Sequence, residues 1–159
     1  MKRILFAVSL IVLAGCSMFS DVKSGRIAFY SLSDELSTGY DFDIMRELDH
    51  TKKGNEIYCY PFYDSNLPKP GILCDEYDPE YSYIIDLGFI TMDSAMTIND
   101  SLIEAGNYVK EWHIWAYDGK SYLLSTGSDE QYILYIDSIF ENADSLLCDH
   151  VIYFSFRKK

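Results

Sequence analysis

The sequence predicts an α+β fold with a largely antiparallel sheet of about six strands and two or three short helices. Aromatic and β-branched residues gather in short runs that turn residues separate, which is typical of strands. Helical spacing of apolar residues occurs in only a few places. Strand-like and helix-like runs do not alternate regularly, which favours an antiparallel sheet over a parallel one.

The first half of the domain is predicted to contain three strands and one helix. Three apolar and aromatic runs favour strands, at residues 26–32 (RIAFYSL), 56–63 (EIYCYPFY) and 82–90 (SYIIDLGFI). Residues 41–50 place Phe42, Met45 and Leu48 at helical spacing, which predicts a short helix. All four prolines lie within residues 61–79, so this stretch is expected to be a loop.

A hairpin is the clearest local prediction of the second half. Residues 91–107 are ambiguous, although Asn99 is a suitable cap for a short helix over residues 100–105. Asp118-Gly119 separates two apolar and aromatic runs within residues 109–126, which predicts a type I′ turn. That hairpin would place Trp115 opposite Tyr122.

The last part of the chain is predicted to form a helix and a closing strand. Ser128 and Gln131 form a capping box, and isoleucines follow at spacings of three. These features predict a helix over residues 129–142, with a strand through the YILYI stretch as the alternative. Residues 150–156 (HVIYFSF) favour a strand, and residues 157–159 are expected to be a solvated basic tail.

The charge of the chain excludes some functions. The formal net charge is −12, with 25 acidic and 13 basic side chains. A chain this acidic repels nucleic acid, so we expect no nucleic-acid binding. It favours cationic partners instead, because opposite charge accelerates encounter.

No motif for a catalytic, metal or cofactor site stands out, so we expect no cofactor and no metal. Cys148 and His150 stand two residues apart, so they would share one face of a strand. An enzyme with a dispersed site around His113 or this pair therefore remains an alternative. An acidic loop (Asp75, Glu76, Asp78 and Glu80) does not match the spacing of a calcium loop.

The predicted hairpin supplies a candidate binding surface. One face would carry His113, Trp115, Tyr117 and Tyr122. If the other face covers the core, this face is an aromatic platform suited to stacking a sugar or gripping a peptide. If both faces are packed, these side chains are simply core residues.

Cysteines add a prediction about covalent structure. Cys59 and Cys74 flank a proline-rich segment and are the favoured disulfide pair, which leaves Cys148 as the odd thiol. Pairs that include Cys148, or no disulfide at all, remain the alternatives. A disulfide requires an oxidising compartment.

The amino terminus indicates such a compartment. Lys2 and Arg3 precede an apolar run of signal-peptide length, which is too short to span a bilayer. The run ends in Leu13-Ala14-Gly15-Cys16, which resembles the lipobox of bacterial lipoproteins. The resemblance covers residues 1–20 only. It implies that residues 1–15 are removed as a signal peptide and that Cys16 is lipidated.

These predictions combine into one expectation for the whole chain. Residues 16–25 would tether a single α+β domain, residues 26–159, to a membrane of the bacterial envelope. Ser17 follows the cysteine, which favours the outer membrane under the family's sorting pattern. The expected function is non-enzymatic binding of an envelope protein or of a cationic enzyme or toxin. A glycan-binding module that uses the aromatic hairpin face is the alternative binding function.

Overall fold

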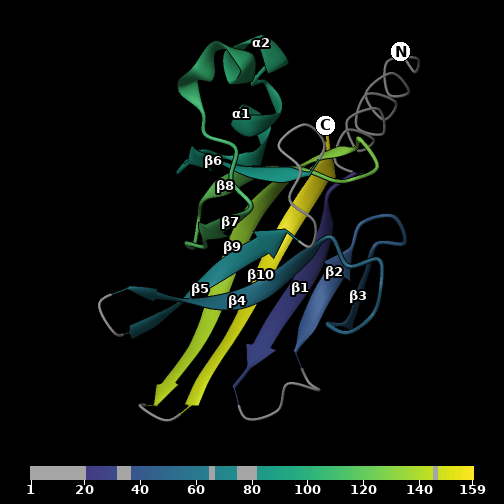
Figure 1. Ribbon diagram of the computed structural model, residues 1–159. Coiled ribbons are helices and arrows are strands. Elements are labelled where there is room, and N and C mark those ends of the chain that lie inside the picture. The colour runs from purple at the N-terminus through teal and green to yellow at the C-terminus, as the bar shows by residue number, and fades with distance from the viewer. Residues whose placement is uncertain (1–20, 32–36, 65–66, 75–81, 145–146) are drawn as a thin grey trace, which may run out of the picture.

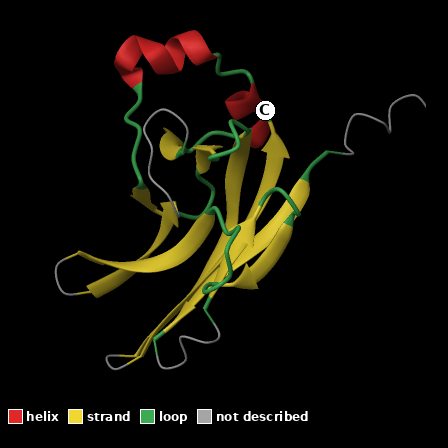
Figure 2. Ribbon diagram, turned by 45° about the vertical axis from the view of Figure 1, so that its right-hand side comes forward, coloured by secondary structure: helices red, strands yellow, loops and turns green. Residues whose placement is uncertain are grey.

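A computed structural model describes residues 21–31, 37–64, 67–74, 82–144 and 147–159. In this part of the chain, ten strands form one antiparallel sheet, and three short helical segments lie at one end of it (Figures 1 and 2). The sheet curls until its edge strands meet at an isolated bridge between Ile84 and Glu111. The α+β prediction is therefore wrong, because the protein is mostly β with a nearly closed, barrel-like sheet.

The strands lie in the order β6-β8-β9-β10-β1-β2-β4-β5-β7, and β3 pairs with β2 outside this path. Their bounds are β1 (Lys23–Tyr30), β2 (Thr38–Asp41), β3 (Arg46–Asp49), β4 (Ile57–Asp64), β5 (Leu67–Cys74), β6 (Tyr83–Gly88), β7 (His113–Trp115), β8 (Ser121–Ser125), β9 (Gln131–Asp144) and β10 (Leu147–Lys158). The runs at 26–32, 56–63, 82–90 and 150–156 are thus confirmed as strands. Strand β1 already begins within the predicted tether, residues 16–25.

Strand β9 replaces the helix predicted over residues 129–142, so the alternative interpretation was right. The ladder with β10 pairs Ile136 with Phe154 and Ser138 with Tyr153, which leaves Asp137 as an extra residue. This bulge allows Ile136 and Ile139 to face the same core although they stand three apart. The spacing that predicted a helix is therefore produced by a bulged strand.

Two more predictions at the other end of the sheet are wrong. The helix over residues 41–50 is absent, because Asp41 ends β2 and a turn leads into β3. Part of the proline-rich loop, residues 61–79, is strand β5. Pro70 fits there because its ladder bond runs from the Ala116 N–H to the Pro70 carbonyl, which needs no donor from proline.

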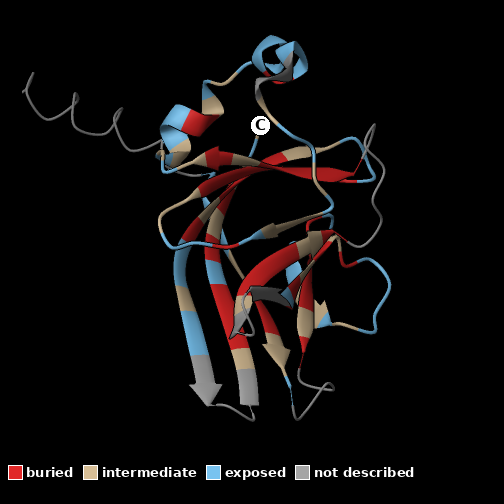
Figure 3. Ribbon diagram, turned by 60° about the vertical axis from the view of Figure 1, so that its left-hand side comes forward, coloured by how far each residue is buried: buried red, intermediate tan, exposed pale blue. Residues whose placement is uncertain are grey.

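Two apolar cores lie on opposite sides of the curled sheet. The larger core fills the inside of the sheet, and the buried residues lie along several of the strands (Figure 3). It contains an aromatic cluster that β2, the turn after it, β9 and β10 contribute. Its rings belong to Tyr40, Phe42, Tyr132, Phe154 and Phe156. The smaller core lies between β6, β8 and β9 and the helical segments, and includes Ile85, Ala95 and Ile133. Residues 133 and 134 of β9 therefore face different cores.

The helical segments are α1 (Met92–Met96), α2 (Asp100–Leu102) and the π-helical η3 (Ile103–Asn107). The predicted Asn99 cap is confirmed, since its side chain accepts a 3.0 Å hydrogen bond from Leu102 N. The predicted basic tail, residues 157–159, instead ends β10 and carries three ion pairs. They join Arg157 to Asp93, Lys158 to Glu130 and Lys159 to Asp100. Two of these pairs tie the helical segments to the sheet.

Among the residues that the structure describes, no helix is long and apolar enough to cross a bilayer.

Candidate ligand-binding cleft

The predicted type I′ hairpin is wrong, but its residues stay together in space. Strand β7 pairs with β5, whereas β8 pairs with β6 and β9. The segment between them turns tightly, and Lys120 N donates to Tyr117 O at 3.2 Å. Only Gly119 of the two central turn residues has a positive φ, at 75°, while a type I′ turn requires both. The chain therefore crosses from one edge region of the sheet to the other.

A cleft opens where β6 and β7 approach each other beside the Ile84–Glu111 bridge. Its larger hollow has a volume of about 840 Å³. The lining residues are Asp86, Leu87, Gly88, Tyr108, Val109, Glu111, His113, Ile114, Trp115 and Lys120. We call this hollow, together with the smaller one that follows, the seam cleft.

The smaller hollow adjoins the larger one and has a volume of about 370 Å³. It is lined by Lys69, Pro70, Phe89, Trp115, Ala116, Tyr117, Asp118, Ile139 and Glu141. Trp115 lines both hollows, so the two share one residue of their walls. The seam cleft therefore extends across Trp115 from the end of β6 to the outer part of β9.

Lys120 links the rings of the cleft to its carboxylates. Its ammonium forms an ion pair with Asp86 and lies 4.7 Å from the ring centre of Tyr117 and 5.4 Å from that of Phe89. The Lys120 side chain is only 14% exposed. Partial desolvation strengthens both contacts relative to a fully exposed lysine. Lys120 therefore holds the two rings and Asp86 in a fixed arrangement.

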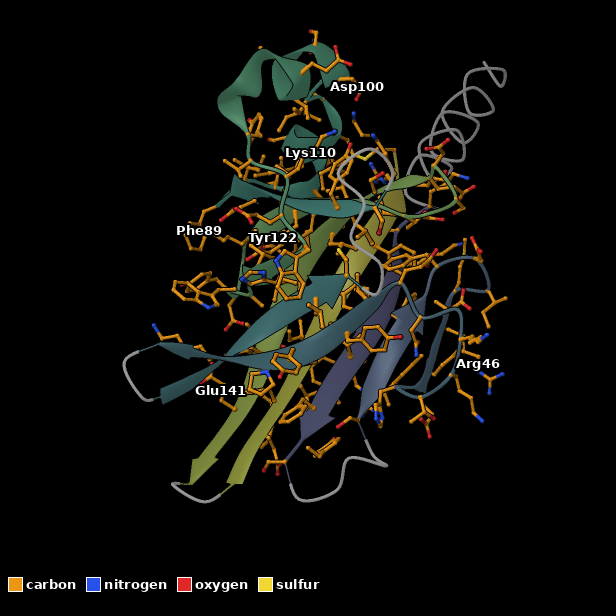
Figure 4. The ribbon with its side chains drawn as sticks, viewed as in Figure 1. Arg46, Phe89, Asp100, Lys110, Tyr122 and Glu141 are labelled. Carbon is orange, nitrogen blue, oxygen red and sulfur yellow. The ribbon has the colours of Figure 1, made fainter. Side chains whose placement is uncertain are left out.

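The end of β6 presents Phe89 to solvent. The register of the β6–β8 ladder shifts between Asp86 and Gly88, and Gly88 has a φ of 84° that favours glycine. Gly88 N donates to the second carboxylate oxygen of Asp86 at 2.7 Å. The chain leaves the strand here, and Phe89 is 71% exposed and points outward (Figure 4).

Tyr122 supports the cleft from inside instead of lining it. The prediction that it lies on the binding face is wrong, because the side chain is fully buried in the main core. Its hydroxyl donates to Trp115 O at 2.9 Å and accepts from Tyr117 N at 3.2 Å. Burial raises the pKa of Tyr122 far above the usual range, so the hydroxyl stays protonated. Tyr122 thus fixes the backbone that carries Trp115 and Tyr117.

The other predicted surface residues do line the cleft. His113 and Trp115 face the larger hollow, and Trp115 and Tyr117 face the smaller one. Trp115 is 40% exposed, and the Lys69 ammonium lies 5.5 Å from its ring centre. Trp112 packs edge-on against His113 at 4.5 Å but lines neither hollow. Three of the four predicted residues are therefore brought together.

The two sulfur predictions have different outcomes. The side chains of Cys59 and Cys74 are both buried, and the predicted disulfide between them is not formed in this structure. Cys59 lies opposite Ile72 and Cys74 opposite Ile57, which places the two cysteines diagonally across β4 and β5. Burial raises the pKa of the Cys74 thiol to about 12. The Cys148 side chain lies outside the described residues.

His150, the other half of the alternative catalytic pair, is fully buried, and loss of solvation lowers its pKa. The acidic loop with Asp75, Glu76, Asp78 and Glu80 lies outside the described residues, and so does Cys16. Within the described ranges, no cluster of three or more histidine, cysteine or acidic side chains is arranged to hold a metal ion.

Sequence reasoning missed the residues that close the cleft from other strands. Asp86 and Phe89 come from the end of β6, Lys69 from β5, and Glu141 from β9. No local pattern marks them, because each reaches the cleft through long-range pairing. The Asp118-Gly119 turn was the one local signal, because a two-residue loop there places Lys120 opposite Tyr117.

No family model, no curated protein and no solved structure matches the chain.

Proposed function

We propose that this protein is a lipid-anchored lipoprotein of the bacterial envelope that acts as a non-enzymatic binding module, with the seam cleft as its ligand site. The observation that carries the binding function is the cleft itself. It combines exposed rings with carboxylates and ammonium groups at one concave place, which is how small-ligand and partner sites are typically built. The anchor rests on the lipobox resemblance, Leu13 to Cys16.

Lipidation of Cys16 explains why the chain would need no membrane-spanning segment. Two or more acyl chains hold a protein stably on a bilayer, whereas one chain does so only marginally. Outer-membrane placement follows from Ser17 under the same resemblance. The folded domain would then stand just off the membrane and present the cleft to the surrounding compartment.

Changing Cys16 to serine is expected to release the protein from membranes. The hydroxyl cannot form the thioether that carries the lipid, so the variant should leave the membrane fraction and the detergent phase. The measurement is the distribution of wild type and Cys16→Ser between membrane and soluble fractions. Cys59→Ser is the matched control, since that thiol is buried in the domain. Equal membrane retention of all three proteins would contradict the anchor.

Binding through the cleft predicts that Trp115→Ala loses the ligand. Full chain in detergent would be immobilised, and envelope extract from the source cells would be passed over it at low and high salt. Bound protein and bound carbohydrate would both be measured. We expect wild type to retain a component that Trp115→Ala does not retain, because the variant removes the ring shared by both hollows.

The same column separates the two kinds of partner. A cationic protein should be lost at high salt, because the attraction between exposed charges is screened. A neutral ligand should remain. Equal retention by wild type and Trp115→Ala, or an empty column, would contradict the cleft as the ligand site. Tyr153→Ala is the matched control, since Tyr153 is a 42% exposed ring that lines neither hollow.

A further inference from the structure

We infer that the seam cleft binds a neutral oligosaccharide of β-1,4-linked pyranose units, stacked on Trp115. This inference rests on the proposed binding function and names the class of ligand. Four features of the cleft support it: its extended shape, its exposed rings, its mixture of hydrogen-bonding groups, and the charged side chains that line it.

The shape suits an extended ligand of several units. The two hollows measure about 840 and 370 Å³ and share Trp115. Each lies within the range of about 300–1,000 Å³ that small-molecule sites have. A ligand that occupies both hollows would be elongated and would pass Trp115, which the two linings share.

The rings of the cleft supply flat contact surfaces. Three of the exposed side chains that line the cleft are aromatic, with Phe89, Trp115 and Tyr117 at 71%, 40% and 37% exposure. A pyranose whose substituents are equatorial has flat faces of C–H groups. Those faces pack against an aromatic plane and make weak C–H contacts with its π-electrons. The β-1,4 linkage keeps successive sugar rings extended, as the cleft requires.

The polar groups match hydroxyls, which both donate and accept. Asp86 and Glu111 line the larger hollow, and Asp118 and Glu141 line the smaller one. Carboxylates accept strong hydrogen bonds from hydroxyl donors. Lys120 and Lys69 add donors, one to each hollow. A ligand made of hydroxyl groups can use both kinds of partner at once.

The charges disfavour ionic ligands. An ammonium group of the ligand would be repelled by the ammonium groups of Lys120 and Lys69, which already lie beside the rings of the cleft. An anionic ligand would meet four lining carboxylates on a chain of net charge −12. A neutral ligand meets neither repulsion, although it must share the Trp115 ring with Lys69.

The test uses the two tryptophans of the chain, Trp112 and Trp115, as built-in reporters. Full chain in detergent would be titrated with tetra-N-acetylchitotetraose and with cellotetraose, and tryptophan emission and heat would be recorded. We expect saturable binding that salt does not weaken. Trp115→Ala should weaken the affinity at least about tenfold, whereas Trp112→Phe should keep both the affinity and the emission change of Trp115.

Maltotetraose serves as the comparison ligand, because its α-linkage bends the chain away from the extended form. If maltotetraose bound as tightly as both β-linked sugars, the proposed preference for a β-1,4 linkage would be contradicted. If none of the three oligosaccharides bound at concentrations up to about 10 mM, the proposal of an oligosaccharide ligand would be contradicted. If the extract column then still shows Trp115-dependent capture of a protein, the proposed binding function is supported and only the proposed ligand class is wrong. Circular dichroism of each variant would verify that the fold is intact.

Discussion

Replacing Phe42 with alanine is expected to lower the free energy of unfolding by about 3–5 kcal/mol. Phe42 is fully buried, and its ring centre lies 4.7 Å from that of Tyr132, 4.9 Å from that of Tyr40 and 5.1 Å from that of Phe156. The cluster joins three distant parts of the chain, so its neighbours cannot collapse freely into the cavity. Urea unfolding followed by circular dichroism would measure the loss.

Phe140→Ala is the matched control for that experiment. Phe140 lies on β9 and is 56% exposed, so its removal should change stability by no more than about 0.5 kcal/mol. A similar loss for both variants would mean that the aromatic cluster contributes no special packing. A loss below about 1 kcal/mol for Phe42→Ala would contradict the packing of the larger core.

The same phenylalanine explains why the helix over residues 41–50 was predicted and is absent. Phe42, Met45 and Leu48 have helical spacing, but only Phe42 reaches the core. Met45 is 39% exposed and has a φ of 54°, which ends a turn, and Leu48 lies on β3 opposite Gly39. The spacing is therefore a coincidence of a turn and two short strands. Three apolar residues are too few to distinguish these cases.

The strands that the sequence did predict share one property. Each of β1, β4, β6 and β10 begins or ends near a turn and contains a run of apolar residues rich in aromatic or β-branched side chains. Such composition favours strands locally, whatever the rest of the chain does. Strand β9 was harder, because both faces of its first part are buried and the bulge at Asp137 changes the period. Its alternation is therefore hidden in the sequence.

The candidate site was predictable in part for the same reason. His113, Trp115 and Tyr117 are close in sequence, so any extended or turning chain would keep them together. Their neighbours in the cleft, such as Phe89, depend on the meeting of β6 and β7, the two ends of a path of nine strands. Strand β7 was expected to pair with β8, the next strand in the chain, and β5 takes that place instead. Such non-local pairing is not encoded in any short motif.

Glu56→Gln is expected to stabilise the protein at alkaline pH. Burial raises the pKa of Glu56 to about 7, and the nearby carboxylates of Asp43, Asp41 and Glu130 raise it further. A hydrogen bond of 2.6 Å from Phe42 N opposes this rise. Ionised Glu56 is therefore held in an unfavourable environment, and an amide of the same shape removes the charge while it can still accept from Phe42 N.

The sign of the pH dependence follows from the raised pKa. Below the ordinary pKa of 4.5, Glu56 is protonated in both the folded and the unfolded chain, so burial of a charge costs the folded state no stability there. Between 4.5 and about 7 the unfolded chain loses the proton first, so stability falls as pH rises. Because the side chain is only partly buried, we expect a total loss of about 1–2 kcal/mol, after allowance for solvent screening.

Urea midpoints measured across this pH range would separate the variant from wild type. Glu56→Gln should match wild type at the acidic end and exceed it by about 1–2 kcal/mol at about pH 8. The exposed Glu104 on η3 provides the control, and Glu104→Gln should leave the profile unchanged. If Glu56→Gln were more stable than wild type by the same amount at all pH values, the gain would come from the shape of the side chain and not from its charge. If Glu56→Gln were less stable than wild type at alkaline pH, the expected effect would be contradicted. The negative charge of Glu56 would then stabilise the turn that holds Phe42.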